Sequence, residues 1–104
     1  MSVQEFESIF SVSIQNLFFS NEAPLYYKGQ YLSGLFFIKK GKIHLLNSGQ
    51  SSVVLEENQI LGLKPSSLLT VSNENAIVEG NTEILFVSKS DVLKNRKFLK
   101  KYFQ

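Results

Sequence analysis

The sequence predicts a mainly β protein with helices at both ends, and three observations support this prediction. Short apolar runs recur at roughly ten-residue intervals between residues 24 and 87, with turn-forming residues between them. Apolar residues before and after this region recur at helical spacing. A chain of 104 residues with 43% hydrophobic content can bury one substantial core. We therefore predict one domain, with residues 1–20 helical, residues 24–87 an antiparallel sandwich, jelly roll or barrel, and residues 88–104 helical.

The N-terminal helix begins at a capping signal. Ser2, followed three residues later by Glu5, has the form of a capping box, and apolar residues then recur at helical spacing. Several serines weaken this helix because their side chains compete for backbone hydrogen bonds. We therefore expect a break near Val12, a second short helix through Leu17, and a turn that ends at Pro24.

The predicted strands follow this turn. The clearest signal is Leu35–Leu46, which we expect to be a hairpin that folds back at Lys39-Lys40-Gly41, with Gly41 in the left-handed conformation. An isolated two-stranded ribbon is only marginally stable in water, so this hairpin requires further strands to pack against. We expect those strands at residues 25–27, 51–55, 60–61, 68–71, 76–79 and 83–87.

The C-terminal segment predicts two short helices. Ser88 has the position of an N-cap with Asp91 in the first turn, and the apolar spacing fits one helix to about Asn95 and a second from Arg96 onward. The second helix is amphipathic, and its apolar side is a candidate docking surface for a partner protein or a second copy. The alternative is that this side packs onto the β region. The residues concerned are Phe98, Leu99, Tyr102 and Phe103.

Charge is unevenly distributed along the chain. From Lys89 to Gln104 six cations accompany one acid, a net charge of +5, whereas the rest of the chain carries −3. A basic helix of this kind can contact nucleic acid, acidic lipid or an acidic protein. It can equally be a solvated face whose cations suit the negative end of the helix dipole. We expect no nucleic-acid binding by this domain alone.

Composition excludes several classes of protein. The chain has no cysteine, so it can form neither a disulfide framework nor a thiolate metal site. Its first ten residues contain acids rather than the basic n-region of a signal peptide. No run approaches the ~18 consecutive apolar residues that cross a bilayer. We therefore expect a soluble, cytoplasmic protein without membrane insertion.

No catalytic constellation is found. His44 is the only histidine, and one ligand cannot make the metal site of a cupin-type enzyme, so we expect a structural role for it. The sequence contains no nucleophile elbow and no glycine-rich phosphate loop. Glu56 and Glu57 are adjacent, and neighbouring side chains of an extended chain point in opposite directions, which makes them a poor acid–base pair. We expect no enzymatic activity.

Several short motifs occur in a defined order along the chain. They are the aromatic-x-x-Gly turn at residues 26–29, the Ile-x-x-Gly-x-Ile pattern at residues 38–43, Leu61-Gly62, and Ala76-Ile77-Val78. Together with the order of elements, they resemble the cyclic-nucleotide-binding domain, the sensor module of catabolite-activator-type regulators, kinases and gated channels. The resemblance implies an antiparallel double-stranded β-helix, or jelly roll, with flanking helices and a regulatory role.

The resemblance also implies the position of a phosphate-binding cassette. Its candidate residues are Gly62, Leu63, Lys64, Ser66, Ser67, Glu74, Asn75 and Ala76. In the family, a glutamate after the cassette glycine holds the ribose hydroxyl, and an arginine before the exit strand grips the cyclic phosphate. These positions fall here on Leu63 and on Glu74 or Asn75. Because a charge-assisted hydrogen bond contributes roughly 1.5 to 3 kcal/mol, loss of the arginine lowers affinity ~100-fold or more. We therefore expect no cofactor, and cyclic-nucleotide binding is disfavoured.

Three functions from different classes remain open. The first is a regulatory module with a degenerate cassette that acts through protein contacts, including self-association. The second is a small-ligand sensor of a larger transcription regulator, in which Lys64 binds a cyclic nucleotide or another anion with the backbone amides of Ser66 and Ser67 behind it. The third is a DNA-associated regulator whose output domain lies outside this chain.

Overall fold

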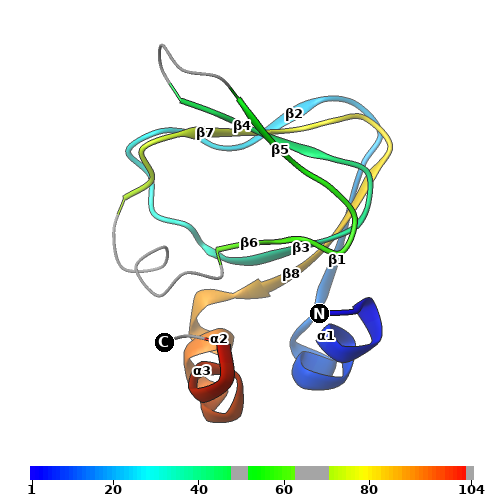
Figure 1. Cartoon of the computed structure of the whole chain (residues 1–104), viewed down its shortest axis with the longest axis vertical. Helices are drawn as coiled ribbons and strands as arrows, with labels where there is room; N and C mark the ends of the chain where they lie inside the picture. Colours follow the sequence, from blue (N-terminus) through cyan, green and yellow to red (C-terminus); the bar gives the residue numbers. More distant parts are fainter. Residues whose placement is uncertain (48–51, 63–70, 103–104) are drawn as a thin grey trace.

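The computed structural model of the chain describes residues 1–47, 52–62 and 71–102. These residues form two antiparallel four-stranded sheets with helices near both ends of the chain (Figure 1). The strands are β1 (Gln15–Phe19), β2 (Ala23–Tyr26), β3 (Gly34–Lys40), β4 (Ile43–Leu46), β5 (Val53–Leu55), β6 (Ile60–Leu61), β7 (Asn75–Val78) and β8 (Thr82–Ser88). The helices are α1 (Val3–Phe10), the short 3-10 helix η1 (Ser11–Ser13), α2 (Lys89–Lys94) and α3 (Arg96–Tyr102).

Four continuous segments of the chain, here called ribbons, each contribute one strand to each sheet. One sheet has the strand order β1-β8-β3-β6 and the other has the order β2-β7-β4-β5. The successive pairs β1 and β2, β3 and β4, β5 and β6, and β7 and β8 therefore each have one strand in each sheet. Every ribbon bends from one sheet to the other between its two strands. This arrangement confirms the predicted jelly roll, in the form of a double-stranded β-helix.

The hairpin predicted within Leu35–Leu46 is wrong. β3 pairs with β6 and β8, whereas β4 pairs with β5 and β7, so the turn at Gly41 carries the chain between sheets and does not fold it back. β3 and β8 both have seven residues and are rich in apolar side chains. A ladder between them buries more apolar surface than a pairing of β3 with the four-residue β4.

Gly41 allows the bend in the ribbon of β3 and β4. Its φ is +98°, the left-handed value predicted from the sequence, and a Cβ placed there would lie 2.2 Å from the Thr82 hydroxyl oxygen. Thr82 is fully buried, and its hydroxyl accepts a hydrogen bond of 3.3 Å from the backbone N–H of Lys42. The backbone N–H of Glu79 donates to the Lys42 carbonyl at 3.0 Å. These contacts join the ribbon of β3 and β4 to the ribbon of β7 and β8 at the corner, the point where both bend from one sheet to the other.

The N-terminal segment is only partly helical. The hydroxyl of Ser2 accepts a hydrogen bond of 3.1 Å from the N–H of Glu5, which confirms the predicted cap. The second helix expected through Leu17 is wrong, because β1 occupies that position and pairs with β8. A short isolated helix leaves most of its end groups without partners, whereas the ladder with β8 satisfies the β1 backbone while Leu17 packs against the core. The helical region within residues 1–20 therefore ends at Ser13.

The helices cover the outer face of the β1-β8-β3-β6 sheet (Figure 1). The ring of Phe6 on α1 stacks on Phe37 of β3 at a centroid distance of 4.9 Å. Phe36 lies on the opposite face of the same strand and packs against Phe86 at 5.0 Å. β3 is therefore buried on both faces, which explains its continuous apolar run. None of the described helices is long and apolar enough to cross a membrane.

The two C-terminal helices confirm the sequence prediction. Ser88 is the N-cap of α2, and its hydroxyl accepts a hydrogen bond of 3.3 Å from the N–H of Asp91. The chain then breaks at Asn95, and α3 begins at Arg96.

We predict that Gly41→Ala destabilises the protein more than Gly29→Ala. Gly29 also has a left-handed φ, +92°, but an added Cβ there meets no atom within 4 Å, so both variants share the conformational penalty of roughly 1–2 kcal/mol. Only Gly41→Ala also overpacks against Thr82, which adds about 1–3 kcal/mol. Urea unfolding of both variants measures the difference. Equal losses of unfolding free energy in the two variants would contradict a role for the close contact between Gly41 and Thr82.

Candidate functional site

The described part of the predicted cassette lies at two places in the β-roll. Gly62 directly follows β6 and has a φ of +100°. A Cβ added to Gly62 would lie 3.0 Å from the carbonyl oxygen of Gly34 and 3.1 Å from the side chain of Leu32. The start of the cassette is thus packed closely against the start of β3. The candidate residues Leu63, Lys64, Ser66 and Ser67 lie outside the described residues.

The second part of the cassette, Glu74 to Ala76, and the preceding Ser72 lie against the aromatic-x-x-Gly turn at residues 26–29. The N–H of Gly29 donates to the carbonyl of Ser72 at 2.7 Å, and the N–H of Ser72 donates to the carbonyl of Gln30 at 2.8 Å. Four residues after Ser72, the buried Ala76 of β7 is the ladder partner of Tyr26 of β2. Two motifs separated by almost fifty residues in the sequence are therefore neighbours in the structure.

Asn75 holds this turn in place. Its side-chain oxygen accepts a hydrogen bond of 2.7 Å from the backbone N–H of Lys28. The acceptor of this side chain thus joins β7 to the turn after β2. Asparagine is uncharged and so supplies no positive charge to a ligand, and its side-chain oxygen already accepts from Lys28.

Glu74 lies close to a buried phenol. Tyr26 is 7% exposed, and its pKa is raised to about 12. Burial is the larger cause, and the negative charge of Glu74 acts in the same direction. A hydrogen bond between Tyr26 and Ser72 acts in the opposite direction. The phenol therefore stays neutral at physiological pH, beside a carboxylate. The single arginine of the sequence, Arg96, is exposed at the first residue of α3.

Solved structures of other proteins share this architecture. The catabolite activator protein of Thermus thermophilus matches 97% of the chain with a TM-score of 0.71 and 20% identity. A cyclic nucleotide-binding-like protein of Brucella abortus matches 93% with a TM-score of 0.66 and 21% identity. The regulatory domain of Toxoplasma gondii PKA, solved with cAMP, matches 80% with a TM-score of 0.67 and 13% identity. This chain has the fold of a cyclic-nucleotide-binding domain.

The cyclic-nucleotide-binding fold implied by the sequence motifs is thereby confirmed. The chain spans 48% of the length of the Thermus protein, 84% of the Brucella protein and 34% of the Toxoplasma chain. No protein-family model and no curated protein sequence matches it. At these identities the likeness concerns the fold, so the function of the site has to be argued from its own residues.

The predicted docking residues lie on α3, and the structure separates them. Phe98 is only 1% exposed and packs against Phe10 of α1 at a centroid distance of 4.9 Å, so its assignment to an exposed docking surface is corrected. Its apolar ring is better removed from water against α1 than left on the helix surface. Leu99 and Tyr102 are partly buried and pack against the same core. Phe103 lies outside the described residues.

His44 forms a polar pair on the surface of the second sheet. Its Nε2 atom is hydrogen-bonded to the carboxylate of Glu79, and both side chains are partly exposed. The pair joins β4 to the corner after β7. Within residues 1–47, 52–62 and 71–102, no group of three or more His, Cys, Asp or Glu side chains is arranged to hold a metal ion.

Asn95 is an important residue that the sequence analysis did not single out. Its side-chain oxygen accepts a hydrogen bond of 3.0 Å from the N–H of Phe98, and its amide donates to the carbonyl of Ile9 at 3.1 Å. Asn95 therefore caps α3 and also ties it to α1. An asparagine directly before a helical run is a recognised N-cap signal, so the first role was detectable.

We predict that Tyr26→Phe reduces the loss of stability at high pH. The folded-state pKa is raised from 10.0 to about 12, so this phenol's contribution to stability is complete below pH 10 and is lost as the pH rises toward 12. Urea midpoints across this pH range should therefore fall less steeply in Tyr26→Phe than in the parent. Tyr31→Phe, at a residue 59% exposed, is the control and should retain the steep loss. Identical slopes in all three proteins would refute the role of Tyr26.

We predict that Asn95→Ala lowers the unfolding free energy by about 1–2 kcal/mol, because it removes both the cap and the bond to Ile9. Asn95→Ser retains a cap acceptor but has no amide to reach Ile9. Chemical denaturation should place this variant between Asn95→Ala and the parent. If Asn95→Ser is as unstable as Asn95→Ala, the cap contributes nothing measurable.

Proposed function

We propose that this chain is a non-enzymatic regulatory module on the cyclic-nucleotide-binding fold, with a degenerate phosphate-binding cassette, and that it acts through contacts with another protein. The observation that carries the proposal is the chemistry of Glu74 and Asn75. These two residues occupy the place where the sequence motifs align with the phosphate-gripping arginine of the family. One is an acid, and the other uses its side-chain acceptor to hold the backbone of Lys28.

Electrostatics support the loss of nucleotide affinity. A cyclic nucleotide carries a negative phosphodiester, and a carboxylate near the phosphate position repels it. The negative charge of Glu74 acts on the neighbouring Tyr26, whose phenol is buried and neutral. The guanidinium of Arg96 is exposed on α3, a helix on the outer face of the sheet. The cassette residues that the structure describes are Gly62, Glu74, Asn75 and Ala76. None of them has a cationic side chain that could bind an anion.

The comparisons support a regulatory role and not a catalytic one. The similar structures include a catabolite activator protein and the regulatory domain of a kinase. The β-roll of this chain retains their fold, with the motifs at residues 26–29 and at Ala76 in contact. Without the phosphate grip, the remaining route for a signal in this proposal is contact through the surface of the module. The basic α3 helix makes an acidic partner surface the natural counterpart.

We predict that the protein does not bind cAMP or cGMP with ordinary affinity. If the family's arginine contributes ~100-fold, a micromolar site becomes one with a Kd of about 100 μM or weaker. Isothermal titration with each nucleotide measures this, and the Toxoplasma regulatory domain that was solved with cAMP serves as the positive control. Saturable one-to-one binding at low micromolar concentration would reject the degenerate cassette and favour the sensor alternative.

Contact between two copies is the simplest form of the proposed protein contact. Light scattering over a range of concentrations measures the solution mass. A mass that rises to twice that of the 11.8 kDa chain identifies self-association. A constant monomer mass directs the search to a different protein.

A further inference from the structure

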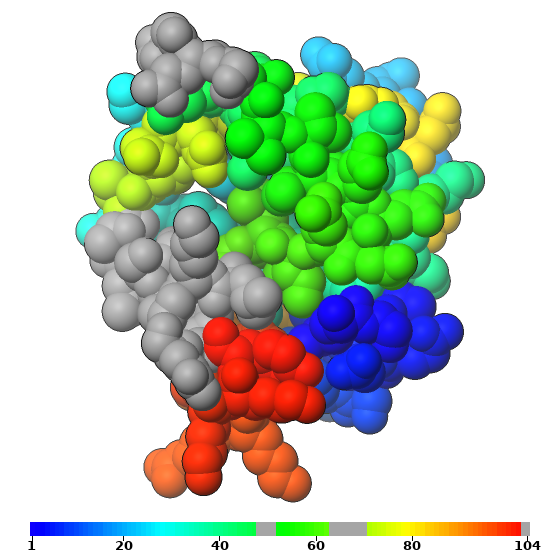
Figure 2. Space-filling view, viewed as in Figure 1, coloured from blue at the N-terminus to red at the C-terminus, as the bar shows by residue number. Residues whose placement is uncertain are grey.

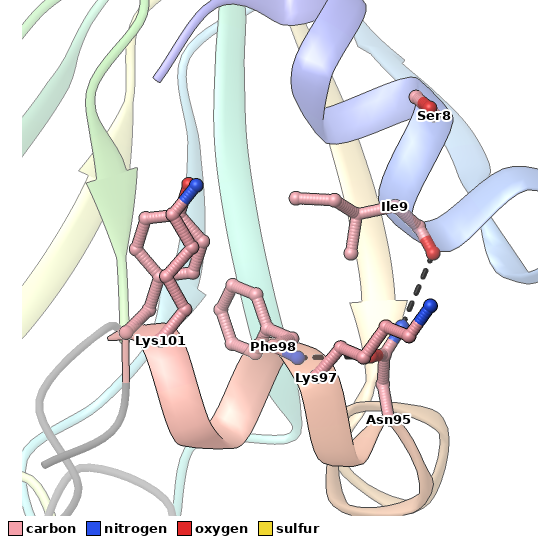
Figure 3. A pocket seen from close by; sticks show the side chains of 7 residues that line it. Ser8, Ile9, Asn95, Lys97, Phe98 and Lys101 are labelled. Atoms are coloured by element: carbon pink, nitrogen blue, oxygen red, sulfur yellow. Dashed lines mark hydrogen bonds between the residues drawn. The ribbon is translucent and has the colours of Figure 1, made fainter.

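A cavity of about 400 Å³ lies between α1 and α3, outside the β-roll (Figure 3). In the space-filling view, the dark-blue residues of α1 and the red residues of α3 lie side by side on one face (Figure 2). We propose that this cavity is a ligand site for a small anionic amphiphile, a molecule with a carboxylate or phosphate head and an apolar body. This proposal goes beyond the regulatory role above and does not depend on whether the cassette binds a nucleotide.

The apolar part of the cavity suits the body of such a ligand. Ile9 of α1 and the rings of Phe98 and Tyr102 of α3 line it. Phe98 is almost fully buried and forms its floor, with Tyr102 packed beside it at a centroid distance of 5.1 Å. In Figure 3 the Ile9 side chain points from α1 toward Phe98. A ligand in the cavity covers the exposed parts of Ile9 and Tyr102 and so removes apolar surface from water.

Two lysines supply the complementary charge. Lys97 and Lys101 both line the cavity, and because they are four residues apart on α3 they lie on one side of the helix. Figure 3 shows them on either side of Phe98. The α3 sequence RKFLKKY contains no acidic residue that could neutralise them. A ligand in this cavity therefore has a lysine side chain on either side of Phe98.

These ammonium groups are available to a ligand. The ion pairs among the described residues join Lys42 to Glu56 and His44 to Glu79, and neither involves Lys97 or Lys101. Lys101 lies over the ring of Tyr102 at 5.3 Å, a contact that leaves its charge uncompensated by a carboxylate. The cavity thus combines an apolar floor with two cations that have no acidic partner in the described part of the chain.

The size of the cavity and its fixed walls favour a small molecule as occupant. Sites for small molecules typically measure about 300–1,000 Å³, and about 400 Å³ lies near the lower end of that range. The hydrogen bond from Asn95 to the carbonyl of Ile9 links the two walls, so the cavity exists before a ligand enters. A bound amphiphile would contact both terminal helical segments at once and would stabilise their association.

The test titrates the full chain with decanoate, decyl phosphate, decanol and acetate, each below its micelle concentration where it forms micelles. We expect one-to-one binding of decanoate, decyl phosphate or both, with decanol and acetate at least about tenfold weaker. The first two probes distinguish a carboxylate head from a phosphate head. Equal affinity for decanol and the anions would overturn the proposal, as would the absence of binding by both anions.

Matched variants locate the site. The double variant Lys97→Gln/Lys101→Gln should weaken binding of the anionic probe at least about tenfold and leave decanol unchanged. Lys94→Gln, on α2 and outside the cavity lining, is the control and should bind as the parent does. Ser8→Phe places a ring at an exposed lining position and should block binding, while urea unfolding verifies that the variant folds. Unchanged binding in both the double variant and Ser8→Phe would place the ligand elsewhere and reject the site.

Discussion

The contact between Gly41 and Thr82 is the constraint on which the β-roll depends. Two ribbons cross from one sheet to the other side by side, and at this corner they approach more closely than a Cβ atom would allow. Left-handed residues also occur at the neighbouring corners, with Asn81 at φ +60° and Asn58 at φ +69°. Bending at these residues lets the same four ribbons form both sheets, which closes the core between them.

The polar groups near the cassette are used to maintain this closed roll. Asn75 holds the backbone of Lys28, and Ser72 exchanges backbone hydrogen bonds with Gly29 and Gln30. Glu74 adds negative charge next to the buried Tyr26. The described residues at this position therefore stabilise the fold and supply no cation for a phosphate. This distribution of roles is the physical basis on which we propose a degenerate phosphate-binding cassette.

The chemistry suited to anions lies instead on the helices outside the roll. Phe6 and Phe98 anchor α1 and α3 in the shared core, and Asn95 connects the two helices directly. This packing removes Phe98 from the surface but leaves Lys97 and Lys101 beside the cavity that it floors. The two ends of the chain thus jointly form a surface with charge and apolar area in close proximity.

The sequence by itself determined the features that depend on neighbouring residues. The caps at Ser2 and Ser88, the left-handed turn at Gly41 and the division of the C-terminal helices all follow from local patterns, and the short motifs identified the fold. The tertiary structure decided which strands pair, and it made residues 15–19 a strand and not a helix, because these outcomes depend on which distant apolar segments bury the most surface together. It also decided the bond between Asn95 and Ile9, which lie 86 residues apart, and with it the cavity between the helices. A local pattern contains no information about a partner at that distance.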